Sequence, residues 1–195
     1  ARQLREQHHR DPHRPLYHFL PAEGAVAPAD PHGCIFWKGK YHLFYGVPLD
    51  GVGCWGHASS IDLVHWTHHP TALSVGPGDP EQHVYAGGAF INKEGIPTMI
   101  YHGVKAGTCI ATSQDDNLDE WTKHPANPVI PIPKEGDPLK DEIHVWDTCA
   151  WVEGDTYYSL SGNLFNPWAP HAPKTDGDIA FLFKSKDMVH WDYVH

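Results

Sequence analysis

The chain contains 195 residues, carries a formal net charge of -10, and has 18 glycines, 18 prolines and 12% aromatic residues. The acidic balance argues against a nucleic-acid partner, which calls for a basic face, and no apolar run reaches the roughly 18 residues that cross a bilayer. The frequent glycine, proline and aromatic residues favour many short strands joined by tight turns.

Residues 1–15 show no signal peptide, which leaves the compartment open, and we interpret them as a lead-in to a domain over residues 16–195. Within this domain a serine, an aspartate-containing spacer and a tryptophan recur at 60–66, 113–121 and 185–191. The tryptophans are 55 and then 70 residues apart, which suits a four-stranded β-propeller blade with variable loops. The repeat therefore predicts an all-β propeller.

Each repeat begins with a strand, a tight turn and a second, aromatic-rich strand. A third strand carries the serine, and an outer strand follows the tryptophan. Propellers need about four to eight blades to close, so we expect the blades beyond these three to come from further sequence or from another chain. The predicted first strands are 33–37, 88–91 and 148–152, the second strands end at Gly46, Gly103 and Gly162, and the third strands are 56–60, 108–113 and 179–185.

We interpret the recurring serine, aspartate and tryptophan as scaffold. Their short polar side chains accept backbone N–H groups in a turn, and the tryptophan packs between blades. The four cysteines have no CxxC spacing and the 17 histidines no HExxH spacing, so we predict no metal and no cofactor. Buried free thiols are expected, although a Cys34–Cys54 disulfide is an alternative.

The informative position is the one that differs between blades. Counted back from the glycine that ends the second strand, Asp30 and Asp147 occupy equivalent places in the first and third repeats, whereas the second repeat has Gly87 or Gly88 there. First strands of propeller blades line the central channel, so both carboxylates should face one funnel. Paired carboxylates are the equipment for cleaving a glycosidic bond. The alternative is that both cap turns, which the Asp30-Pro31 pair keeps open.

Several segments together resemble the N-terminal catalytic propeller of glycoside hydrolase family 32, which contains invertases, inulinases and levanases. The resemblance covers roughly residues 16–195 and is strongest from Asp30 to Leu73. The segments that carry it are Tyr17-His18-Phe19-Leu20-Pro21, Ala29-Asp30-Pro31-His32-Gly33, Tyr41-His42-Leu43-Phe44-Tyr45, Trp55-Gly56-His57-Ala58-Ser59-Ser60 and Asp62-Leu63-Val64-His65-Trp66.

The resemblance implies a five-bladed propeller and retaining hydrolysis of terminal β-fructofuranosides. Asp30 matches the family's nucleophile and Asp147 its transition-state stabiliser. The family's general acid is a glutamate of the fourth blade, beyond His195, so no residue of this sequence takes that role. Carbohydrate is therefore the expected partner.

The sequence differs from the family at positions whose side chains bind sugar hydroxyls. Both asparagines that flank the nucleophile are missing, Gly46 replaces a glutamine, Ala86-Gly87-Gly88 replaces a serine-containing segment, and Trp146 and Thr148 replace an arginine and a proline. We expect an active hydrolase with altered sugar preference, because a hydroxyl-reading site discriminates through its polar partners.

Four further residues are candidates for substrate binding. Trp55, at the position of a rim aromatic in the family, and Trp146 offer faces for sugar rings. Trp37 flanks the same funnel, although its alternation with Phe36 favours packing, and His32 follows the nucleophile closely enough to bond a hydroxyl or tune Asp30.

Two other functions stay open. The neighbouring five-bladed arabinanases and xylosidases invert configuration and often carry Ala-Asp-Pro at this place, and a carbohydrate-binding propeller without catalysis would also tolerate the missing polar residues. The segment from Asn163 to Asp178 is a predicted insertion near the pocket.

Overall fold

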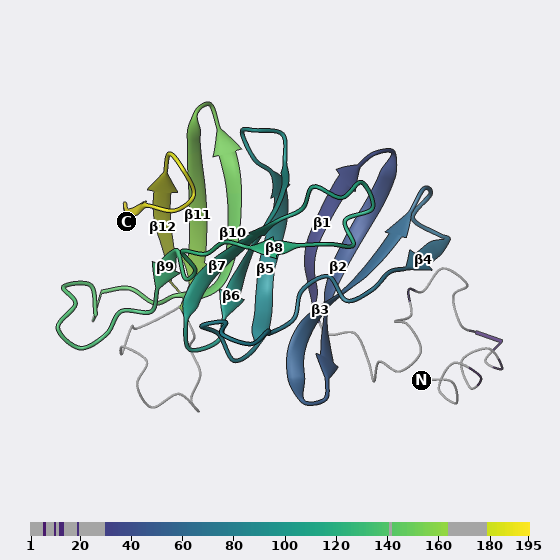
Figure 1. Cartoon of the computed structure of the whole chain (residues 1–195), viewed down its shortest axis with the longest axis horizontal. Coiled ribbons are helices and arrows are strands. Elements are labelled where there is room, and N and C mark those ends of the chain that lie inside the picture. The colour runs from purple at the N-terminus through teal and green to yellow at the C-terminus, as the bar shows by residue number, and fades with distance from the viewer. Residues whose placement is uncertain are drawn as a thin grey trace.

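The computed structural model describes residues 30–140, 142–163 and 179–195, together with Glu6, Arg10, Pro12, His13 and Phe19. These described residues form thirteen β-strands in three antiparallel sheets that lie side by side in chain order (Figure 1). Each sheet corresponds to one repeat. The predicted all-β, blade-by-blade architecture is therefore confirmed, with the three blades forming an open arc of a propeller.

The first blade is a meander in the order β1-β2-β3-β4. A two-residue turn joins its first two strands, and Lys38 and Gly39 both have positive φ, 47° and 81°, as the hairpin turns that match strand twist require. Its strands are β1 (Pro31–Trp37), β2 (Lys40–Leu49), β3 (Val52–Ser60) and β4 (Trp66–His68).

The other two blades repeat this order. In the second blade a short extra strand, β9 (Ile130–Pro131), pairs with β7. The second blade consists of β5 (Val84–Ile91), β6 (Pro97–Gly103), β7 (Gly107–Thr112) and β8 (Thr122–Lys123), and the third of β10 (Trp146–Glu153), β11 (Thr156–Gly162), β12 (Ala180–Ser185) and β13 (Trp191–Tyr193).

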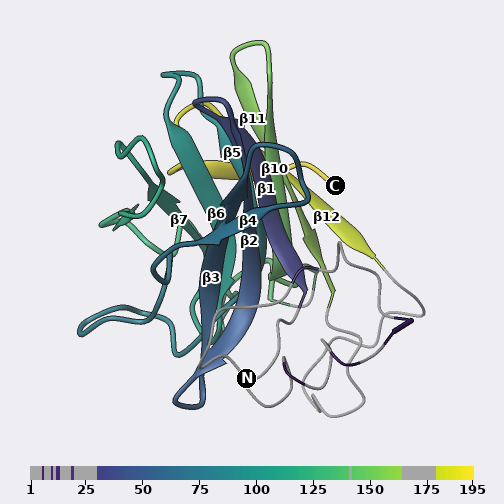
Figure 2. The same cartoon turned by 90° about the vertical axis from the view of Figure 1, so that its right-hand side faces the viewer.

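The hydrophobic core lies between the blades. One cluster joins Phe44 and Trp55 of the first blade to Met99 and Tyr101 of the second, and another joins β6 and β7 to β11 and β12. The inner strands β1, β5 and β10 are neighbours (Figure 2). At Gly33 a Cβ would come within 3.0 Å of the Ala89 backbone nitrogen, so the absence of a side chain permits this close approach.

The recurring serine, aspartate and tryptophan form turns, as predicted. In the first blade the Ser60 hydroxyl accepts hydrogen bonds from the backbone N–H groups of residues 62 and 63. The Asp62 carboxylate accepts hydrogen bonds from the N–H groups of residues 64 and 65, and the four bonds are 2.8–3.2 Å long. The third blade repeats this pattern around Ser185 and Asp187. The tryptophan of the second turn, Trp121, packs edge-on against Phe44 of the first blade.

The structure also tests the expectations for cysteine. All four cysteines are free thiols, two of them buried and two exposed, so the Cys34–Cys54 disulfide is not formed. In the part of the chain that the structure describes, no helix is long and apolar enough to cross a membrane.

Candidate active site

Asp30 and Asp147 line the same pocket, which has a volume of about 450 Å³. This volume is within the range of small-molecule sites. The pocket lies where the inner strands begin, with Asp30 immediately before β1 and Asp147 second in β10. The prediction that both carboxylates face one funnel is confirmed. The other lining residues are His32, Gly46, Val47, Pro48, Gly51, Gly53, Cys54, His83, Val84, Tyr85, Ala86 and Trp146.

A β-bulge sits near the start of each inner strand. His32 falls between the paired residues Pro31 and Gly33, Tyr85 and Ala86 fall between Val84 and Gly87, and Asp147 falls between Trp146 and Thr148. Bulged residues take no part in the ladder, and bulges next to active sites re-aim side chains. The bulged residues of all three blades line the pocket.

Ser161 fixes the backbone beside Asp147. Its hydroxyl accepts from the Trp146 N–H at 2.9 Å and donates to the Trp146 carbonyl at 2.8 Å. Asp147 itself has φ 20°, outside the region that strands adopt. Burial and the negative charge of Asp30 raise the pKa of the Asp147 carboxyl, so the charge on Asp30 opposes the ionisation of Asp147.

Asp30 is anchored through its backbone, because its carbonyl accepts from the Gly46 N–H at 3.0 Å. Two residues later, His32 is 8% exposed and its ring centroid lies 5.1 Å from that of Trp55. Burial lowers the pKa of His32 to about 4, against the opposing effect of the Asp30 charge. The imidazole is therefore neutral at physiological pH, and its Nδ1 has no hydrogen-bond partner among the described residues.

Trp146 lines the pocket beside Asp147 and is partly buried. Its ring lies 4.4 Å from the His102 ring, centroid to centroid, and contacts Tyr85 edge-on at 5.9 Å. These neighbours belong to the second blade, so the indole bridges blades two and three. Its partial exposure in the pocket agrees with the predicted role in stacking on a sugar ring.

The predicted binding role of Trp55 is wrong. Trp55 is 0% exposed, its Nε1 donates to the Tyr85 carbonyl at 2.9 Å, and it packs in the core between the first two blades. A buried ring has no face to offer a ligand. Although Trp55 belongs to a strand that borders the pocket, its side chain holds blades together.

The predicted binding role of Trp37 is also wrong, and the packing alternative is correct. Trp37 ends β1, the strand that Asp30 precedes. At about 3.3 Å per residue the two positions are roughly 20 Å apart. The Trp37 side chain packs against the core cluster of the first two blades.

The second blade contributes pocket residues that were missed by counting back from the glycine at the end of its second strand. Gly103 pairs with Val84, and Gly87 pairs with Tyr101, so Tyr85 and Ala86 rather than Gly87 or Gly88 occupy the place of Asp147. The count failed because residues 92–96 connect β5 to β6, whereas two residues connect the first strands of the other blades. His83 and Tyr85 therefore join the site.

A hairpin of the first blade forms another part of the wall. Strands β2 and β3 continue past the predicted end at Gly46 and meet at Asp50-Gly51, which have φ 50° and 82°. An Asp-Gly pair between strands is the signal of a two-residue hairpin turn, and it would have revealed this arm. Of the predicted insertion 163–178, residues 164–178 lie outside the described residues.

Comparison with known proteins agrees with this geometry. The family model described as "Glycosyl hydrolases family 32 N-terminal domain" matches residues 18–195. Fructan 6-exohydrolase from Triticum aestivum is 33% identical over 91% of this chain and 31% of that protein. Sucrose-6-phosphate hydrolase from Salmonella typhimurium is 35% identical over 93% of this chain and 37% of that protein.

A solved structure gives the same result for the fold. Fructan 1-exohydrolase IIa from Cichorium intybus superimposes with a TM-score of 0.73 at 29% identity, over 91% of this chain and 33% of that one. The chain spans about a third of the length of the relatives it matches.

Proposed function

Because the chain belongs to glycosyl hydrolase family 32, we propose that the protein hydrolyses terminal β-fructofuranosidic bonds. The relatives named above act on fructans and on sucrose 6-phosphate by their names, and one solved relative, 30% identical, is in complex with 1-kestose. The observation that carries the proposal is that two inner strands deliver Asp30 and Asp147 into one pocket.

In the proposed reaction the Asp30 carboxylate attacks the anomeric carbon of the fructosyl unit. The bond from that carbon to the leaving oxygen breaks, the departing oxygen takes a proton from a general acid, and a covalent fructosyl-aspartate forms. Water then attacks the same carbon, returns the proton to the acid and releases fructose with retained configuration. The family resemblance assigns the acid to a glutamate beyond residue 195.

Asp147 has a different role in this proposal. Its raised pKa disfavours the anion, which suits it less to nucleophilic attack than to hydrogen bonding with sugar hydroxyls. These bonds strengthen as positive charge develops on the ring. The Ser161 contacts that hold the backbone of Trp146 set the direction of this carboxyl.

The pocket wall supports an altered preference within the family. Trp146 supplies an apolar face where the resemblance expects an arginine, and His32 supplies a neutral imidazole. Stacking and a neutral donor or acceptor suit an uncharged sugar better than a phosphorylated one. We therefore propose unphosphorylated fructosides as substrates, which measured kcat/KM for sucrose and for sucrose 6-phosphate will test.

The nucleophile is tested by Asp30→Asn in the complete protein, with Asp50→Asn as the matched control. Asp50 is an exposed acid at the tip of the hairpin that walls the pocket. We expect Asp30→Asn to lower kcat by about a thousandfold or more, with unchanged circular dichroism, and Asp50→Asn to keep activity. Activity retained in Asp30→Asn would remove Asp30 from the mechanism.

Two measurements separate the remaining alternatives. NMR of the anomer first released distinguishes retention from inversion, and an inverted product would assign Asp30 the role of a base, as in the arabinanase-like alternative. A complete protein that binds fructosides by calorimetry but never hydrolyses them would instead be a carbohydrate-binding propeller.

A further inference from the structure

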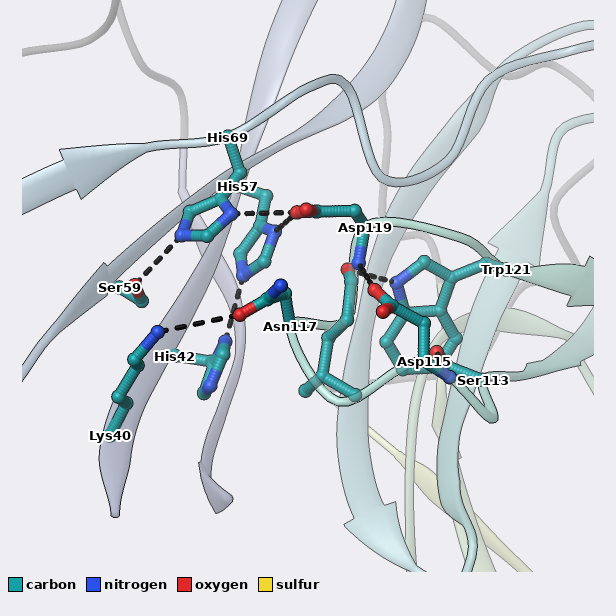
Figure 3. A network of polar contacts seen from close by, with 11 residues as sticks. Lys40, His42, His57, Ser59, His69, Ser113, Asp115, Asn117, Asp119 and Trp121 are labelled. Carbon is teal, nitrogen blue, oxygen red and sulfur yellow. Dashed lines mark hydrogen bonds and ion pairs between the residues drawn. The ribbon is translucent and has the colours of Figure 1, made fainter. Parts of the chain in front are cut away.

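A second group of polar side chains lies outside the pocket, between the first two blades (Figure 3). Its centre, which we term the His-Asp cluster, consists of His57 on β3, His69 just after β4, and Asp119 in the turn between β7 and β8. One donor atom from each residue lies within 4.8 Å of the others. The two histidines are further joined by a backbone hydrogen bond of 3.1 Å.

Both imidazoles direct Nδ1 at the same carboxylate oxygen. The Oδ1 atom of Asp119 lies 2.6 Å from Nδ1 of His69 and 3.6 Å from Nδ1 of His57. At 3.6 Å the His57 contact is not a hydrogen bond, and this nitrogen is buried without a hydrogen-bond partner among the described residues. A bound cation would give this buried nitrogen a partner, together with the carboxylate that it faces.

The far nitrogen of each ring is already held. Nε2 of His57 lies 2.9 Å from Nδ1 of His42, and Nε2 of His69 lies 2.7 Å from the Ser59 hydroxyl. Metal-binding histidines commonly have their second nitrogen fixed in this way, which orients the ring and selects the tautomer.

We propose that His57, His69 and Asp119 bind a divalent transition metal, with Zn²⁺ as the best fit. Two imidazole nitrogens and one carboxylate oxygen are a common zinc ligand set, and bonds of 2.0–2.2 Å at tetrahedral angles place ligand atoms about 3.4 Å apart. The His57–Asp119 separation already matches this spacing. The His69–Asp119 contact must open by roughly 1 Å, and Asp119, whose side chain is 31% exposed, has room to move and to admit a water as fourth ligand.

The metal would act as a cross-link. His57 and His69 belong to the first blade and Asp119 to the second. The second turn also contacts the first blade through Trp121 on Phe44 and through the Lys40–Asn117 hydrogen bond, and a metal would add a stronger link between the two blades. The ligands come from positions 57, 69 and 119, spread over 63 residues of sequence, which explains why short-range spacing predicts no metal.

The test uses the complete protein, freed of metal by chelation and then loaded with Co²⁺, whose tetrahedral complexes absorb visible light. We expect one equivalent of visible absorption that Zn²⁺ displaces, and a rise of the unfolding temperature by about 2–3 °C at hundredfold excess of Zn²⁺ over its Kd. Asp119→Asn keeps the shape of the side chain and removes the anionic ligand, and we expect it to abolish both effects.

His190→Ala is the matched control, because His190 forms the same kind of pair with an aspartate, 2.8 Å from Asp187, but has no second imidazole. It should leave the Co²⁺ spectrum and the Zn²⁺ shift unchanged. The proposal is overturned if the wild-type protein shows no tetrahedral Co²⁺ bands, or if Asp119→Asn, folded by circular dichroism, retains them. Either result would show that the cluster holds protons alone. Activity is not a readout here, so failure of this site leaves the proposed hydrolase untouched.

Discussion

Lowering the pH should destabilise the protein because of the buried His102, whose ring contacts that of Trp146. His102 is 1% exposed, neither ring nitrogen has a hydrogen-bond partner among the described residues, and burial lowers its pKa to about 4. In the unfolded chain the imidazole binds a proton below about pH 6.5, whereas the folded protein excludes it down to about pH 4. The stability that His102 contributes is therefore full above pH 6.5 and is lost as the pH falls from 6.5 to 4.

The magnitude follows from the size of this window. A difference from 6.5 to about 4 corresponds to about 3 kcal/mol over the whole range and to about 2 kcal/mol at pH 5. The variant His102→Leu removes the titrating group, and we expect it to equal or exceed the wild type at pH 7.5, because it also removes two unpaired polar atoms.

Urea unfolding followed by circular dichroism at pH 7.5 and pH 5 measures the effect. The variant should gain about 2 kcal/mol on the wild type when the pH falls between these values, whereas His190→Leu, an exposed control with 85% of its side chain accessible, should change by less than about 0.5 kcal/mol. If the difference in free energy of unfolding between the wild type and His102→Leu is the same at both pH values, the reasoning is refuted. That result would mean that the Trp146 ring stabilises the imidazolium.

Two further predictions concern other charged groups. Burial and the Asp30 charge raise the pKa of Asp147, so ionisation of this carboxyl destabilises the folded protein above the raised pKa and has no effect below the ordinary pKa of an aspartate. Asp147→Asn should therefore raise the melting temperature at pH 7 but not at pH 3, as measured by scanning fluorimetry. Glu81 is 3% exposed and lies 2.5 Å from Lys123, so Lys123→Met should cost about 3–5 kcal/mol in urea unfolding, and a loss below 1 kcal/mol would contradict this.

The blades could be predicted from the sequence because each repeat carries its own local signals. The turn residues, the alternating strands and the tryptophan recur in order, and the strands of each blade pair within one repeat. Asp30 and Asp147 were found by the same comparison, since an acid in two of three equivalent places breaks the repeat. Local chemistry therefore predicts the scaffold and the two carboxylates.

Other features depend on packing that one repeat does not encode. All residues of β3 from Cys54 to Ser60 are buried, so the sequence around Trp55 shows no alternation between buried and exposed residues, and a core ring has the same pattern as a binding ring. The contribution of Tyr85 depends on a longer connection and a bulge. The His-Asp cluster depends on two blades meeting, which no spacing along the chain reports.

Because the three pocket residues lie in β-bulges, their side chains are not tied to the strand pairing that holds each blade together. A residue at position 32, 85 or 147 makes no cross-strand pair, so exchanging its side chain leaves the ladder hydrogen bonds of its blade in place. Substrate preference can thus be varied at positions 32 and 85, while position 147 keeps the carboxyl that the proposed reaction needs. A library restricted to positions 32 and 85 is a compact route to new sugar specificity on this propeller.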